Sequence, residues 1–208
     1  MAALLVNAGP LALGVLAGPE QDAHVTRFGY GVILARVPLF LFQAVQAALL
    51  PRLARLATTG EMSEFRRGFK RLMIIVAGVG VVGTGGAYVL GPFAVRKLYD
   101  AELTGRTLAV LALGSVCYMV ALATAQAVIA LRGHSWVALG WTVGVAAFVI
   151  VTVVAGHDAF RRVELGTLAG SAAAMVMFLI ALRSRLAAGA RVDPASLYEA
   201  VTDLPLEG

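Results

Sequence analysis

Charged residues are scarce in this chain of 208 residues, since Asp, Glu, Lys and Arg together make up 14% of it. Hydrophobic residues make up 60%, and the mean hydropathy is +0.85. Only one cysteine is present, Cys117, which excludes an intrachain disulfide and a cysteine-based metal cluster. It lies in an apolar run, where we expect it to act as a packing residue. The composition indicates a membrane protein.

Acidic residues are missing from every long apolar run. We predict six membrane-spanning helices, because each run approaches or exceeds the roughly 20 residues needed to cross a bilayer. The predicted spans are residues 1–18, 27–50, 72–92, 107–131, 135–155 and 165–182. None of them contains Asp or Glu, so a proton or sodium relay built on an intramembrane carboxylate is not encoded here.

Patterns typical of catalysis or metal binding are also missing. Two segments between the spans, residues 96–103 and 156–164, carry Asp100, Glu102, His157 and Asp158. Their spacing suits neither a metal site nor an activated nucleophile, so we interpret both segments as solvated loops. No glycine-rich phosphate loop is present. We therefore predict that the chain is not an enzyme and holds no cofactor or metal.

The predicted fold is an all-α integral membrane bundle. Residues 1–185 form the transmembrane part, and residues 186–208 form a short cytoplasmic tail. In the tail, Asp193 and Pro194 suit the start of a small helix. Residues 1–18 could instead be a signal peptide, but they lack a basic n-region and contain Asn7 and Pro10. We interpret them as a spanning helix.

The basic residues indicate an orientation, because lysine and arginine in short loops are retained on the cytoplasmic side. This assignment puts both termini in the cytoplasm of a multi-pass protein of the cell membrane. Topology therefore explains the net charge of +5, and no nucleic-acid partner is needed. The basic residues assigned to the cytoplasmic face are Arg52, Arg55, Arg66, Arg67, Lys70, Arg71, Arg132, Arg183, Arg185 and Arg191. Those assigned to the opposite face are Arg27, Arg96, Lys97, Arg106, Arg161 and Arg162.

The long cytoplasmic loop carries a helix signal of its own. Thr58 and Glu61 have capping-box spacing, and apolar residues follow at helical intervals, so we predict a short interfacial helix over residues 58–69. Its basic face could meet anionic lipid headgroups, or its charges could serve only to set topology. Both interpretations stay open.

Glycine pairs at GxxxG spacing suggest where helices approach closely, because lipid does not drive apolar helices together. Gly140 and Gly144 form one pair, and Gly166 and Gly170 another. Such spacing also arises by chance in glycine-rich membrane helices.

One arginine, Arg36, lies inside the second predicted span, where a charge costs about 2.5 to 3.5 kcal/mol on insertion scales. On a helix, Gln43 falls within about 20° of it and Gln46 within about 80°. Pro38 removes a backbone hydrogen bond beside it, which makes it a candidate hinge. We predict a polar strip lining a cavity, with Arg36 attracting an anion such as a phosphate. The alternative is an arginine paired with helix carbonyls or with a residue of another chain.

Three stretches of the sequence share features with a known family: LLVNAGPLALGVLAG, GYGVILARVPLFLFQAVQAALLPRLARLATTGEMSEFRRGFKRLM and LGPFAVRKLYDAEL. The specific features are Arg36, Pro38 and Pro51, then Gly60 and Glu61, then Gly91 and Pro92 followed by Leu98 and Tyr99. These stretches resemble the polysaccharide-biosynthesis flippases of the multidrug/oligosaccharidyl-lipid/polysaccharide (MOP) exporter superfamily. The resemblance covers roughly residues 1–185.

The resemblance implies two six-helix lobes around a central cavity, of which this chain would be the C-terminal lobe. The missing N-terminal lobe, or a second subunit, would be its partner. The implied activity is translocation of a lipid-linked oligosaccharide of the polyprenyl-diphosphate type for cell-surface polysaccharide synthesis. Arg36 would contact the diphosphate, and Gln43, Gln46 and Asn7 would line the cavity.

Two other functions remain open. The chain could be a membrane scaffold that recruits polysaccharide-synthesis enzymes through its basic loop and tail. It could also be a MOP-type exporter of small molecules, although Arg36 would repel cationic drugs.

Overall fold

Eight helices make up the part of the chain that the computed structural model describes, residues 2–16 and 22–189, with no strand among them. Side chains at 22–24, 41, 44–46 and 48–50 are outside that description. The helices are α1 (Ala2–Leu16), α2 (Asp22–Ala35), α3 (Val37–Thr58), α4 (Met62–Val89), α5 (Gly91–Tyr99), α6 (Gly105–Ala130), α7 (His134–Val154) and α8 (Ala159–Gly189). The all-α prediction is confirmed for these residues.

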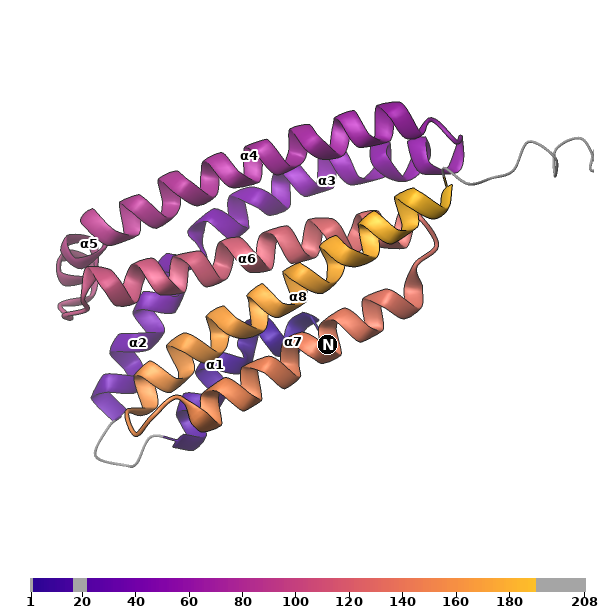
Figure 1. Cartoon of the computed structure of the whole chain (residues 1–208). Helices are drawn as coiled ribbons and strands as arrows, with labels where there is room; N and C mark the ends of the chain where they lie inside the picture. Colours follow the sequence, from indigo (N-terminus) through magenta and orange to yellow (C-terminus); the bar gives the residue numbers. More distant parts are fainter. Residues whose placement is uncertain (1, 17–21, 190–208) are drawn as a thin grey trace, which may run out of the picture.

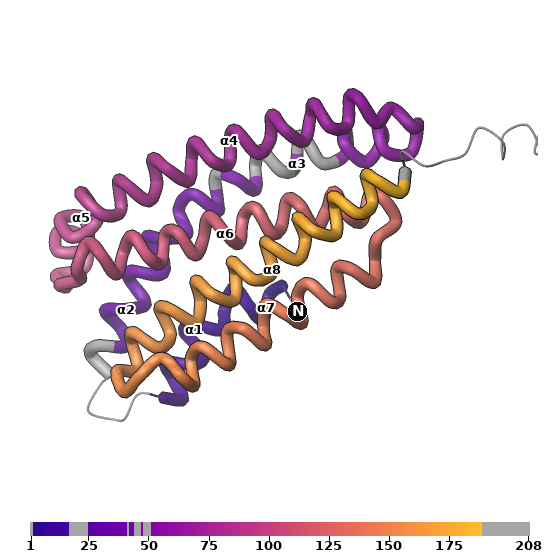
Figure 2. Tube along the Cα trace, in the orientation of Figure 1, coloured from indigo at the N-terminus to yellow at the C-terminus, as the bar shows by residue number. Residues whose placement is uncertain are grey.

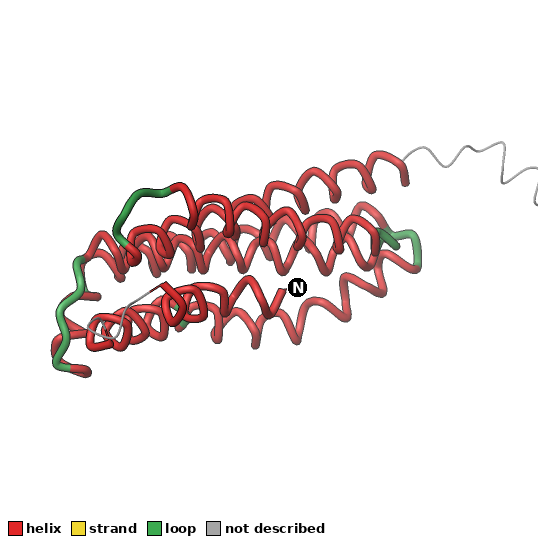
Figure 3. Tube along the Cα trace, turned by 90° about the horizontal axis from the view of Figure 1, so that it is seen from below, coloured by secondary structure: helices red, strands yellow, loops and turns green. Residues whose placement is uncertain are grey.

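The long helices run side by side, and the turns between them gather at the two ends of the bundle (Figures 1 and 3). In Figure 1, α3 and α4 lie along one side, α6 and α8 in the middle, and α7 with α1 along the other side. The central α6 is the most enclosed, with Met119, Ala121 and Ala123 fully buried. By contrast, α4 leaves Val81 and Val82 exposed.

Four helices are long and apolar enough to cross a membrane: α4, α6, α7 and α8. Together with the composition, they indicate a membrane protein. Helix α1 is apolar and has 15 described residues, and residues 1, 17 and 18 of the span predicted there lie outside the described part of the chain. The second predicted span is not one helix, because it is divided at Arg36 into α2 and α3 (Figure 2). The total of six spans therefore stays a prediction.

The two GxxxG pairs lie at the contact between α7 and α8, which confirms that prediction. A Cβ atom placed at Gly144 would lie 2.9 Å from Ala174 Cβ and 3.0 Å from the Gly170 carbonyl oxygen. Placed at Gly140 it would overlap the ring of Phe178, and placed at Gly166 it would overlap Thr152 Oγ1. The missing side chains let the two helix backbones approach closely.

The predicted interfacial helix at residues 58–69 is wrong. Helix α3 ends at Thr58, and the rest of the segment turns directly into α4, which then continues for 28 residues. Glu61 caps no backbone group of α4; its Oε1 accepts a hydrogen bond of 2.8 Å from Thr59 Oγ1. Gly60 makes the reversal possible with a φ of +78°, so α3 and α4 form a helical hairpin.

The two predicted solvated loops are only partly loops. Asp100, Glu102, His157 and Asp158 are exposed, as expected. However, Arg96 to Tyr99 complete the last turn of α5, and α8 begins at Ala159. Helix α8 also extends beyond the predicted start of the tail, to Gly189. Asp193 and Pro194 lie outside the described residues.

A candidate polar site inside the bundle

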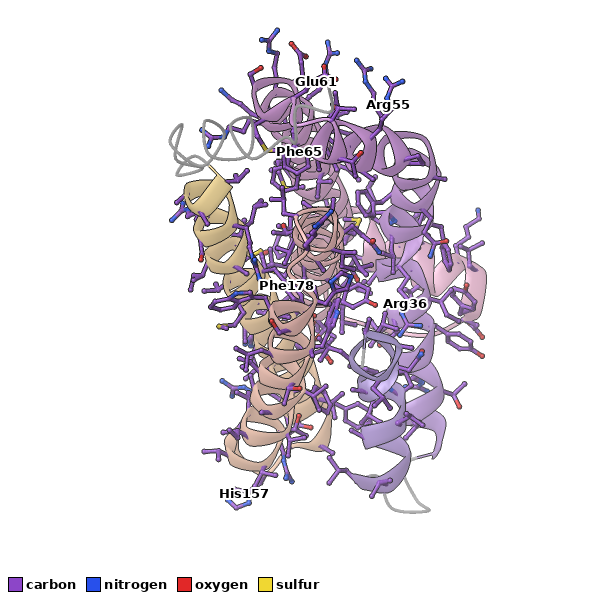
Figure 4. All side chains as sticks on the ribbon, turned by 90° about the vertical axis from the view of Figure 1, so that its right-hand side faces the viewer. Arg36, Arg55, Glu61, Phe65, His157 and Phe178 are labelled. Carbon is purple, nitrogen blue, oxygen red and sulfur yellow. The ribbon has the colours of Figure 1, made fainter. Side chains whose placement is uncertain are left out.

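Arg36 lies at the junction of α2 and α3, between the charged ends of the bundle marked by Arg55 and Glu61 at one end and His157 at the other (Figure 4). Its own N–H donates to the carbonyls of Val32 and Ile33, both at 3.1 Å. Pro38, the second residue of α3, has no N–H, so the Leu34 carbonyl receives no helical hydrogen bond from it. The chain changes direction between α2 and α3 (Figure 2). Arg36 is the residue between these two helices.

The guanidinium of Arg36 reaches across to α1. Its Nη2 donates a hydrogen bond to the carbonyl oxygen of Val6. That carbonyl lies four residues before Pro10, which has no N–H to donate to it. Arg36 therefore donates to a carbonyl oxygen of α1 that cannot receive its usual hydrogen bond from Pro10. This hydrogen bond matches the alternative interpretation of the sequence, in which the arginine pairs with a helix carbonyl.

The positive charge itself has no acidic partner among the side chains that the structure describes. The one ion pair found there joins Arg67 and Glu64 near the start of α4, at 3.3 Å. A guanidinium carries five N–H donors, and the bond to Val6 uses one of them. Half-buried Arg36 thus keeps both its charge and donor capacity for other acceptors.

A small cavity of about 30 Å³ adjoins the guanidinium. This volume holds roughly two water molecules and is too small for a sugar or a diphosphate. Polar groups line it beside apolar ones: Tyr118, Ser115, Thr167 and Ser171. The Tyr118 hydroxyl donates to the Ala2 carbonyl at 3.2 Å. These groups suit water that hydrates a buried charge.

Two other predicted cavity residues, Asn7 and Gln43, do not line the cavity beside Arg36. Asn7 is exposed, and its side-chain amide donates to Ala3 in its own helix, at 2.9 Å. Gln43 is exposed on α3, and the side chain of Gln46 lies outside the described residues. Pro38 faces α4, where its Cγ would lie 3.1 Å from a Cβ placed at Gly83. A continuous polar strip is therefore not seen on the described side chains.

The sequence interpretation offered a helix carbonyl as an acceptor for Arg36, but it did not identify Val6 or the groups that line the cavity. Pro10 carried a usable signal, since a proline inside a helix frees the carbonyl four residues earlier, and an intramembrane arginine needs an acceptor. Tyr118, Ser115 and Ser171 carried no such signal. They come from helices far away in the chain, and only packing brings them to the cavity.

One carboxylate is also buried, at the end of the bundle where α8 begins. Glu164 is 7% exposed, and its Oε1 has no hydrogen-bond partner in the described structure. Arg106 and Arg161 interact with it electrostatically. No group of three His, Cys, Asp or Glu side chains within the described ranges could hold a metal ion.

Comparison of the chain with protein-family models, with curated proteins and with solved structures finds no match. The geometry around Arg36 must therefore carry the functional argument.

Proposed function

We propose that this chain is one lobe of a flippase that translocates a lipid-linked oligosaccharide of the polyprenyl-diphosphate type across the cytoplasmic membrane. The observation that carries the proposal is the charge of Arg36. It lies inside the bundle without an acidic partner among the described residues, while four of its donors are not used by Val6. An intramembrane charge of this kind usually serves a pathway or a ligand.

A diphosphate fits this arginine chemically. Phosphate oxygens accept two parallel N–H bonds from a guanidinium fork and supply the missing negative charge. The existing cavity of about 30 Å³ cannot enclose such a headgroup. In this proposal the headgroup approaches Arg36 from a larger space outside the lobe, where a second lobe or subunit would complete the cavity.

The break at Arg36 gives the lobe a place to bend. Helices α2 and α3 are joined by one residue, and Pro38 weakens the backbone hydrogen bonding there. In this proposal α1, the α2–α3 pair, α4, α6, α7 and α8 correspond to the six segments of the lobe. Alternating access would use the α2–α3 break as a hinge.

Charge asymmetry supports the proposed orientation. The bundle end formed by the α3–α4 turn, the α6–α7 turn and the end of α8 is the more basic one within the described chain. It carries Arg52, Arg55, Arg66, Arg67, Lys70, Arg71, Arg132, Arg183 and Arg185, with Glu61 and Glu64 as its acidic residues. By the positive-inside rule this end faces the cytoplasm.

Binding of undecaprenyl diphosphate to the purified chain tests the proposal. Native mass spectrometry would give dissociation constants for the wild type, for Arg36→Gln and for the control Arg96→Gln, which removes one exposed positive charge away from the cavity. We expect Arg36→Gln to weaken binding by about tenfold to a hundredfold, the range for a charged hydrogen bond. Equal affinities for the two variants would remove Arg36 from substrate binding.

A scaffold function predicts a different pattern. Substitutions at the basic α3–α4 turn would then abolish recruitment of a polysaccharide-synthesis enzyme and leave lipid translocation intact. Point substitutions are needed for this test, because deleting residues 58–69 would remove the turn and the start of α4.

A further inference from the structure

A groove of about 330 Å³ lies between the end of α3 and the beginning of α4, away from Arg36. Three arginines line it: Arg52 from α3, and Arg67 and Arg71 from α4. Arg67 and Arg71 are four residues apart, so they lie on one face of their helix. All three are exposed. Arginines from two separate helices thus line the same groove.

This positive charge is only partly compensated. Glu64 lines the same groove and forms a 3.3 Å ion pair with Arg67. Arg52 and Arg71 form no ion pair within the described residues. The groove therefore has an excess of two positive charges, and its arginines can offer forked donors to an anion.

The floor of the groove is apolar. Leu53 and Leu56 are 4% and 7% exposed, and Gly68 completes the lining. A Cβ placed at Gly68 would lie 3.1 Å from Leu53 Cδ2, so the two helices meet closely at this point. A ligand with a charged head and an adjoining apolar part would match this surface.

The position of the groove along the bundle points to the kind of ligand. Toward the end of the bundle, Arg55 and Glu61 project beside the α3–α4 turn (Figure 4). In the other direction, exposed apolar side chains begin at Ile74, less than one helical turn after Arg71, with Ile74 62% and Ile75 39% exposed. The arginines thus lie at the boundary between a polar end and a lipid-exposed surface, the depth of phospholipid headgroups.

We propose that Arg52, Arg67 and Arg71 bind the phosphate of an anionic phospholipid, with its acyl chains lying along α3 and α4. Basic pockets between membrane helices are suited to such headgroups. The site is independent of the proposed transport function, because it uses neither Arg36 nor its cavity.

Titration of the purified chain with dioleoylphosphatidylglycerol, followed by native mass spectrometry, tests this site. Removing an arginine near a headgroup weakens binding by about fivefold, so we expect roughly a 25-fold loss for the Arg52→Gln/Arg71→Gln double variant. The control is Arg96→Gln/Lys97→Gln, which removes the same charge at the opposite end and should leave the affinity unchanged. Equal losses in both double variants would overturn the proposal.

A variant that is expected to increase the affinity distinguishes loss of the site from loss of folding. Glu64→Gln removes the acid that pairs with Arg67, so it should tighten phosphatidylglycerol binding by a few-fold. Weaker or unchanged binding by this variant would contradict the site.

Two further probes identify the ligand. Dioleoylphosphatidylcholine, which has no net charge, should bind at least tenfold more weakly than phosphatidylglycerol. Inorganic phosphate should not displace the lipid at equal concentration. Displacement by inorganic phosphate would show a site for a soluble anion and would overturn the assignment to a lipid.

Discussion

Arg36 donates a hydrogen bond to the carbonyl of Val6, a carbonyl to which the helix itself cannot donate because Pro10 stands four residues later. The proline in α1 thus leaves free the carbonyl oxygen to which the arginine at the α2–α3 break donates. This pairing joins α1 to the break and places the guanidinium beside the small polar cavity.

A double-mutant cycle between Pro10 and Arg36 should therefore show coupling. Pro10→Ala supplies the missing backbone N–H to the Val6 carbonyl, so Arg36→Gln should destabilise that variant less than it destabilises the wild type. We expect a coupling energy of about 1 kcal/mol, measured from unfolding free energies in detergent micelles. The cycle of Pro10→Ala with Arg106→Gln is the control and should be additive within about 0.5 kcal/mol. Additivity in both cycles would show that the hydrogen bond contributes nothing to stability.

The contact between α7 and α8 depends on missing side chains. Gly144→Ala would place a Cβ 2.9 Å from Ala174 Cβ and 3.0 Å from a backbone oxygen, so we expect destabilisation by about 1 to 3 kcal/mol. Gly85→Ala is the matched control, because a Cβ at Gly85 meets nothing within 4 Å. It should be neutral or stabilise α4 by up to about 1 kcal/mol. Thermal unfolding of both variants in the same detergent measures the difference, and similar losses would refute the close α7–α8 packing.

The corner between α4 and α6 should tolerate substitution equally poorly. A Cβ at Gly105 would overlap the carbonyl oxygen of Tyr88, a backbone atom that cannot swing away. This carbonyl precedes Pro92 by four residues and so also lacks its usual helical donor. We expect Gly105→Ala to lower the thermal unfolding temperature clearly, while Gly86→Ala, with open space around it, should not. An unchanged transition for Gly105→Ala would mean that α6 begins elsewhere.

The orientation can be tested by labelling single cysteines. Cys117 is buried and should not react with a membrane-impermeant maleimide, and Cys117→Ala removes it as a background. In that background, His157→Cys should label in intact cells, because His157 is exposed at the end assigned to the outer face. Thr59→Cys, exposed at the basic end, should label only after the membrane is permeabilised. The reverse pattern would invert the proposed topology.

The sequence was most informative where a local pattern decides the structure. Apolar runs predicted the long helices α4, α6, α7 and α8, because such runs of about 20 residues form helices in lipid. The GxxxG spacing indicated residues that lie at a helix contact, since close helix packing in membranes needs small residues, and the structure showed that α7 and α8 are the helices that meet there. The capping-box pattern at Thr58 and Glu61 wrongly predicted a separate helix, because the chain reverses at Gly60 and continues directly into α4.

For the candidate site, the sequence identified Arg36 and the neighbouring Pro38 but not what surrounds them. It placed Gln43 on the same helical face as Arg36, and that arithmetic assumed one uninterrupted helix. The break at Arg36 and the approach of α1 turn the guanidinium toward Val6, while the Gln43 side chain stays exposed.

The sequence by itself determined that the chain is helical and suited to a membrane, and that one charge lies inside an apolar segment. Only the tertiary structure decided what surrounds that charge, because Val6, Tyr118 and Ser171 lie on three separate helices. It also brought Arg52 together with Arg67 and Arg71 in one groove. Both arrangements arise from helix packing between distant segments, and local periodicity carries no information about such contacts.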